Sequence, residues 1–170
     1  EIKQEAERRG ICGMGTTVVL ICFNLRSHRD ACIMHVGDSR VYRYRNRSLM
    51  RMTTDHSMAA ESGISDGAMV PMFMAGVITR AVGVKEDVMV DRTPADVCKG
   101  DVFLLCSDGL YNMVPEPHMT SILRNETVDP AAELVNAANE AGGFDNITVV
   151  VIQVLEGVEP RDPALDETVT

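Results

Sequence analysis

The sequence predicts a single α+β domain with antiparallel sheets and helices that are separate from the strands in the sequence. Short strand-like runs follow one another in the first half of the chain, helical patterns gather in the second half, and a final strand-like run follows them. The 170 residues, 45% hydrophobic and 24% charged, are enough for one ordinary domain with a core.

Hydrophobic periodicity and turn residues place the expected elements. The run at residues 16–25 is apolar throughout, which predicts a strand covered on both faces. The run at 41–45 alternates, which predicts one solvent-exposed face, and Asn46 and Arg47 then form a hairpin turn. Further strands are expected at residues 31–36, 48–53, 88–92, 102–106 and 147–155. Helices are expected at residues 1–9, 115–124 and 130–141. One more helix is expected to begin near residue 55, with Asp55 or Ser57 as its N-terminal cap.

Two segments predict irregular structure. Residues 62–75 mix Gly, Pro, Ser and Met without a period, which is typical of a long functional loop. Residues 156–170 are rich in Pro and acids and predict a flexible acidic tail. The domain is therefore expected to occupy residues 1–155.

Charge and cysteine content exclude several classes of protein. Sixteen Lys and Arg against 25 Asp and Glu give a net charge of −9, which argues against a nucleic-acid partner. No apolar window approaches the roughly 20 residues of a membrane span, so no membrane partner is expected. The five cysteines form no C-x-x-C pair, which predicts small buried hydrophobes in a reducing, cytoplasmic environment: Cys12, Cys22, Cys32, Cys98 and Cys106.

Two aspartates lie at the ends of strongly apolar runs. Asp108 follows the run at 102–106, and Asp145 precedes the run at 147–155, so rigid strands position both. Two carboxylates about 5 Å apart repel by roughly 3 kcal/mol, which a hard divalent cation offsets. Asp55 is a third candidate at a strand end. The alternative for each is a turn or cap residue, and the pattern alone leaves both open.

Short motifs along the chain, taken together and in this order, resemble those of the metal-dependent type 2C protein phosphatases, closest to the bacterial branch. The motifs span nearly the whole expected domain, and each alone is weak. They are residues 13–17 (GMGTT), 35–40 (HVGDSR), 54–57 (TDHS), 78–83 (ITRAVG), 100–110 (GDVFLLCSDGL) and 145–148 (DNIT).

The resemblance implies an activity and a cofactor. In that family two Mn²⁺ or Mg²⁺ ions, with a third bound weakly, activate a water that attacks phosphoserine or phosphothreonine directly. The implied partners are phosphorylated proteins of a Ser/Thr kinase pathway. The fold that the resemblance implies is a two-sheet antiparallel β-sandwich flanked by helices.

The resemblance also assigns residues. Asp108 and Asp145 match two metal ligands, and Asp55 matches the acid that helps to hold the weaker third metal. Asn146 matches a residue that orients the neighbouring carboxylate, and residues 62–75 match the variable flap beside the site. Asp38 and Arg40 match residues that fix a strand end.

One departure from the family pattern affects the expected activity. Family members carry further strands before the helix that matches residues 1–9, with an Asp and an Asp-Gly motif that complete the metal ligands. The sequence therefore predicts an N-terminally incomplete domain with impaired activity. The alternative is a non-catalytic pseudophosphatase or regulatory protein-binding module.

Overall fold

The chain folds into seven strands and five helices within the residues that the computed structural model describes, which are 1–27, 29–64, 69–125 and 128–160. The strands form two antiparallel sheets, in the orders β1-β2-β5 and β4-β3-β6-β7. The elements are α1 (Ile2–Arg9), β1 (Val18–Phe23), β2 (Asp30–Val36), β3 (Arg40–Arg45), β4 (Ser48–Arg51), α2 (Met58–Glu61), β5 (Asp91–Asp96), β6 (Val102–Cys106), α3 (Asp108–Tyr111), α4 (Glu116–Arg124), α5 (Pro130–Glu140) and β7 (Val149–Gln153).

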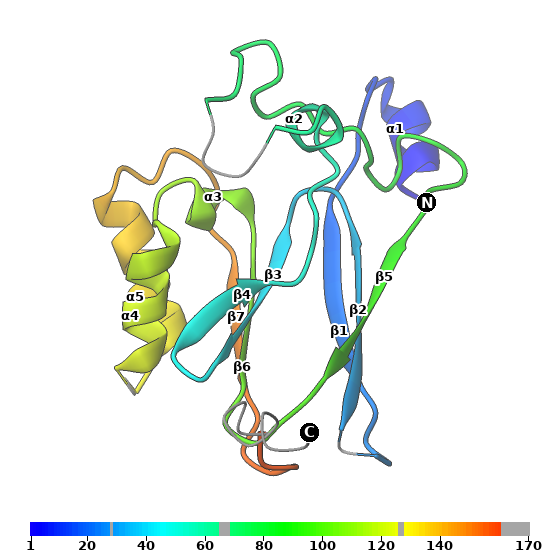
Figure 1. Cartoon of the computed structure of the whole chain (residues 1–170). Coiled ribbons are helices and arrows are strands. Elements are labelled where there is room, and N and C mark those ends of the chain that lie inside the picture. The colour runs from blue at the N-terminus through cyan, green and yellow to red at the C-terminus, as the bar shows by residue number, and fades with distance from the viewer. Residues whose placement is uncertain (28, 65–68, 126–127, 161–170) are drawn as a thin grey trace.

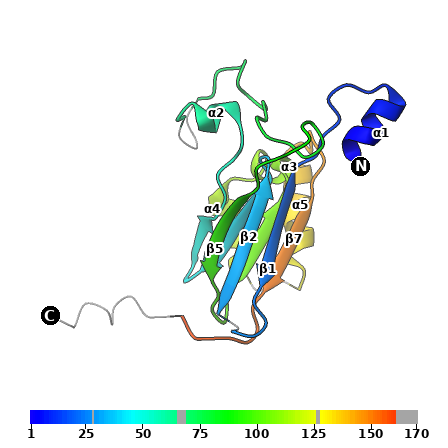
Figure 2. The ribbon, with the colours of Figure 1, turned by 90° about the vertical axis from the view of Figure 1, so that its right-hand side faces the viewer.

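The two sheets and the C-terminal helices form three layers (Figures 1 and 2). One apolar core lies between the sheets, where Phe23 and Phe103 meet edge to face with ring centroids 5.7 Å apart. A second core joins the outer face of the β4-β3-β6-β7 sheet to α3, α4 and α5, through residues such as Leu104 and Leu134. The predicted α+β sandwich with flanking helices is confirmed.

Two predictions about strand burial are wrong. Strand β1 is not covered on both faces within the described part of the chain, because Val19 and Ile21 pack into the core while Val18 and Cys22 are exposed. Conversely, β3 has no solvent-exposed face over its first half. Val41 faces the other sheet and Tyr42 faces the helices, and both are fully buried.

Local sequence signals fix several turns as expected. Asn46 and Arg47 both have positive φ angles and make the tight turn between β3 and β4. The Ser57 hydroxyl caps α2 by accepting a hydrogen bond from the Ala60 amide at 3.3 Å. The strand expected at residues 88–92 instead begins at Asp91, because its register is set by pairing with β2.

The remaining expectations have mixed outcomes. Only Cys98 and Cys106 are buried, so the prediction of buried cysteines holds for two of the five. Residues 62–64 and 69–75 have no helix or strand, as predicted, whereas 65–68 and 161–170 lie outside the described residues. Among the described helices, none is long and apolar enough to cross a membrane.

Candidate metal centre

A cavity of about 420 Å³ lies at the end of the sandwich where Figure 1 shows α2 and α3. Three aspartates from separate segments line it: Asp38 between β2 and β3, Asp55 before α2, and Asp108 at the start of α3. The structure therefore brings the predicted residues Asp55 and Asp108 to one cavity. It adds Asp38, for which the resemblance implies only a structural role.

Asp108 is positioned by the end of β6 and by contacts with the segment that leads into β7. The Ser107 hydroxyl donates to the Asn146 carbonyl oxygen at 2.9 Å and accepts from the Thr148 amide at 3.0 Å. Gly109 packs so closely that a Cβ there would lie 2.4 Å from the Asn146 carbonyl oxygen. The backbone around Asp145 and Asn146 is thus held against the first turn of α3.

Asp145 is not among the described residues that line the cavity, although its backbone carbonyl oxygen would lie 3.4 Å from a Cβ at Gly109. It is exposed, and its Oδ1 accepts a hydrogen bond from the Asn146 amide at 2.6 Å. The backbone of Asn146 therefore orients this carboxylate. The close approach of this segment to Gly109 is compatible with a site shared by Asp108 and Asp145, which stays a prediction.

Asp55 is held by two guanidinium groups. Its Oδ2 lies 2.7 Å from Arg40 Nη2 and its Oδ1 lies 2.7 Å from Arg51 Nη2, and only 10% of its side chain is exposed. Each oxygen of this nearly buried carboxylate therefore has a charged hydrogen-bond donor beside it. A metal at Asp55 would compete with both arginines, so its role as a ligand stays a prediction.

Asp38 has a different electrostatic setting from Asp55. Burial raises the pKa of its carboxyl above the ordinary value, and the negative charges of Asp108 and Asp55 raise it further. Tyr111, one helical turn after Asp108, donates its hydroxyl to the Asp38 carbonyl oxygen at 3.0 Å, and Arg40 stacks 3.4 Å above its ring. Asp38 and Asp108 are therefore tied together in a crowded acidic site that favours a bound cation.

A neighbouring group of His35, His56 and Asp91 supports the Asp38 turn. Their ligand atoms lie within 4.8 Å of one another, but His56 Nδ1 already accepts a hydrogen bond from the Gly37 amide at 3.1 Å. The proton of this ring therefore lies on Nε2, which faces Asp91 Oδ2 at 3.2 Å. Burial lowers the pKa of His56, and the contact with Asp91 partly opposes this shift. The neutral ring holds the turn rather than offering a lone pair to a metal.

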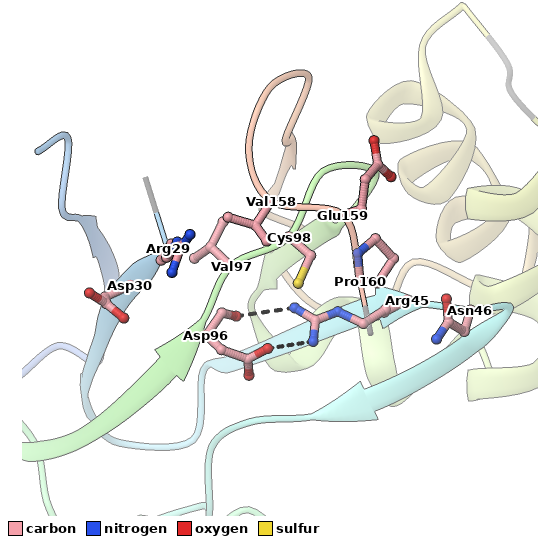
Figure 3. Close-up of a pocket in the computed structure, with 10 residues that line it drawn as sticks. All are labelled: Arg29, Asp30, Arg45, Asn46, Asp96, Val97, Cys98, Val158, Glu159 and Pro160. Carbon is pink, nitrogen blue, oxygen red and sulfur yellow. Dashed lines mark hydrogen bonds and ion pairs between the residues drawn. The ribbon is translucent and has the colours of Figure 1, made fainter. Parts of the chain in front are cut away.

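A larger cavity, of about 740 Å³, is shown in Figure 3. Arg45, one of the two arginines that line it, makes ion pairs with Asp96 and Asp101. Because these charges neutralise one another, the smaller cavity with its three clustered aspartates is the better candidate for metal chemistry.

Comparisons with curated proteins and with solved structures found relatives of this chain. No family model matches the chain. The serine/threonine phosphatase stp of Listeria monocytogenes serotype 4b (strain F2365) is 38% identical over 147 residues, which cover 83% of this chain and 57% of that protein. The chain thus spans little more than half the length of this relative.

Solved structures show the same fold. The Mycobacterium tuberculosis serine/threonine phosphatase PstP/Ppp is 30% identical, covers 91% of this chain and 67% of its own, and gives a TM-score of 0.78. A PstP catalytic domain in complex with two manganese ions is 31% identical over 91% of this chain and 66% of its own, with a TM-score of 0.76. The chain belongs to the bacterial branch of the metal-dependent (type 2C) serine/threonine protein phosphatase family.

Proposed function

We propose that this chain takes part in the metal-dependent hydrolysis of phosphoserine and phosphothreonine in proteins. The observation that carries the proposal is the meeting of Asp38, Asp55 and Asp108 in one cavity, in a chain of the phosphatase family. Its substrates would be phosphoproteins produced by a Ser/Thr kinase pathway. The five cysteines are all unpaired, which supports action in the reducing cytoplasm.

The donor set fits Mn²⁺ or Mg²⁺. Hard cations prefer oxygen ligands, and burial together with the negative charge of Asp108 raises the pKa of Asp38, so a cation bound between these carboxylates would favour their charged forms. We propose that Asp108 and Asp145 hold two ions, with Asp38 facing the same site and Asp55 near a weaker third ion. When bound, such ions lower the pKa of a coordinated water and neutralise the phosphoryl oxygens.

The 170-residue chain alone is expected to bind metal weakly and to turn over slowly. Each divalent ion of this kind takes about six ligands, and three or four carboxylates supply only part of them. The chain spans 57% of the Listeria relative, so further ligands are to be sought in the rest of such proteins.

Hydrolysis of p-nitrophenyl phosphate and of a phosphothreonine peptide, with Mn²⁺ and with a chelator, tests the proposed function. We expect slow hydrolysis of both substrates that requires Mn²⁺. Manganese binding without any hydrolysis, even at high protein concentration, would favour the alternative of a regulatory protein-binding module. Absence of both binding and hydrolysis would contradict the proposed metal centre.

Gly109→Ala tests whether Asp108 and Asp145 form one site. The added Cβ would meet the Asn146 carbonyl oxygen at 2.4 Å and its carbonyl carbon at 2.9 Å, so the backbone must move apart. We expect Mn²⁺ affinity, measured by calorimetry, to fall about 10-fold, and unfolding free energy to fall by about 1–3 kcal/mol.

Gly100→Ala is the matched control for this substitution. Gly100 has a positive φ of 84° but no atom within 4 Å of an added Cβ, so alanine there strains the backbone without touching the site. It should lower stability and leave Mn²⁺ affinity unchanged. Unchanged Mn²⁺ affinity in Gly109→Ala would contradict a shared site.

A further inference from the structure

The cavity beside Asp108 has two chemically different walls. One wall is polar and carries Asp38, Arg40, Asp55 and Asp108. The other wall comes from α2, its cap Ser57 and the flap, and its apolar side chains are those of Ala59, Ala60, Ile64, Val70, Met74 and Ala75. None of the described lining residues from these segments is charged, so the cavity has an acidic part and a mainly apolar part.

The apolar wall is tied to the acidic one through the backbone around Asp55. The next residue, His56, accepts a hydrogen bond from the Thr79 amide at 2.8 Å through its carbonyl oxygen. The Met58 amide donates to the Val77 carbonyl at 2.9 Å, and the Ile64 amide donates to the Ala59 carbonyl at 3.1 Å. These bonds hold the backbone on both sides of the flap against the segment that carries Asp55 and α2.

A phosphate group alone does not use both walls. Phosphate oxygens are recognised by cations and polar groups. Arg40, and any metal ions held by Asp38 and Asp108, would provide these on the polar wall. A cavity of about 420 Å³ has room for the phosphoryl group and for side chains next to it. A charged or amide side chain against Ile64, Val70 and Met74 would lose water without gaining a partner, whereas an apolar one gains by burial.

We propose that Ile64, Val70 and Met74 form a subsite for an apolar side chain adjacent to the phosphorylated residue. This inference rests on the proposed phosphatase function and adds a substrate class, phosphopeptides with an aliphatic neighbour. Methionine is flexible and polarisable, so Met74 adapts to aliphatic side chains of different shapes. The subsite thus selects apolar character rather than one residue.

Two phosphothreonine peptides that differ only in the residues flanking the phosphothreonine test the proposal. One carries leucine on both sides and the other carries glutamine, so that net charge is equal. We expect kcat/KM to be about 10-fold higher for the leucine peptide. In the double variant Val70→Thr/Met74→Gln, which keeps side-chain size but adds polar atoms, the ratio between the two peptides should approach one.

Met72→Gln is the matched control. Met72 belongs to the same segment, is 94% exposed and is not among the described lining residues, so its replacement should preserve the peptide ratio. Thermal unfolding of each variant checks that the fold is retained. Equal kcat/KM for the two peptides with the unsubstituted protein would overturn the subsite, as would an unchanged ratio in the double variant.

Failure of the subsite and failure of the proposed function are distinguishable. Absence of Mn²⁺-dependent p-nitrophenyl phosphate hydrolysis by the unsubstituted protein would count against the function. In that case the binding of fluorescein-labelled forms of both peptides, followed by anisotropy in Mn²⁺, still decides the subsite. Tighter binding of the leucine peptide, lost in the double variant, supports the subsite, and equal binding overturns it.

Discussion

Asp108→Asn is expected to remove most of the Mn²⁺ binding and all measurable phosphate-ester hydrolysis. The substitution keeps the shape of the side chain but replaces a charged oxygen ligand with a neutral amide. Even changes to residues that only support a metal ligand cost 10- to 100-fold in affinity, so loss of a ligand should cost about 100-fold or more. Isothermal calorimetry with Mn²⁺ measures the binding, and p-nitrophenyl phosphate hydrolysis measures the activity.

The same variant gives a second readout that needs no metal. Because the negative charge of Asp108 contributes to raising the pKa of Asp38, its removal should move the pKa of Asp38 down toward the ordinary value. An NMR titration of the Asp38 carboxyl in metal-free protein would show this shift. Asp87→Asn, at an exposed position outside the cavity, is the control and should change neither readout. Undiminished Mn²⁺ heat in Asp108→Asn would contradict the proposed centre.

The architecture could be predicted from the sequence because the strand signals are local. Alternating polarity, apolar runs and turn residues such as Asn46 and Arg47 each involve only residues that are close together in the sequence. These local signals predict the strands of both sheets. The apolar run at residues 88–90 predicts a strand that begins before the observed β5, because the residues of Asp91–Asp96 are mostly polar and give a weak strand signal. Pairing with β2, a contact distant in sequence, sets its true register, and Pro94 is tolerated because β5 is an edge strand.

The candidate site could be predicted only in part. Asp108 directly follows a buried strand and Asp55 lies at a strand end, so the sequence predicts both as candidate metal ligands. Asp38 occupies an equivalent position after β2, but an aspartate after Gly37 is typical of a turn, and the sequence does not show which residues face it. Its burial and its closeness to Asp108 arise from the packing of α3, which is distant in sequence. The ion pairs of Asp55 with Arg40 and Arg51 could not be read from the sequence for the same reason.

Removing one partner of the buried ion pair between β3 and the turn before β6 should cost more stability than removing one partner of an exposed ion pair. The Asp101 side chain is fully buried and accepts hydrogen bonds from Arg45 Nε at 2.6 Å, from Arg45 Nη2 at 2.7 Å and from the Cys98 amide at 2.9 Å. When Asp101 is neutralised, Arg45, seen in Figure 3, keeps its ion pair with the exposed Asp96 and loses the buried one. Asp101→Asn is therefore expected to lower the unfolding free energy by about 3 kcal/mol, measured by urea denaturation.

The exposed pair of Lys99 and Glu159 gives the matched comparison for Asp101→Asn. Its side chains are 53% and 73% exposed, so Glu159→Gln should cost less than about 1 kcal/mol because solvent screens the pair. The double variant Arg45→Met/Asp101→Leu should regain much of the stability lost in Asp101→Asn, since it leaves no unpaired buried charge at these two positions. Equal losses in Asp101→Asn and Glu159→Gln would mean that burial adds nothing to the Asp101 interaction. That result would contradict the view that this contact holds the end of β3 to the turn before β6.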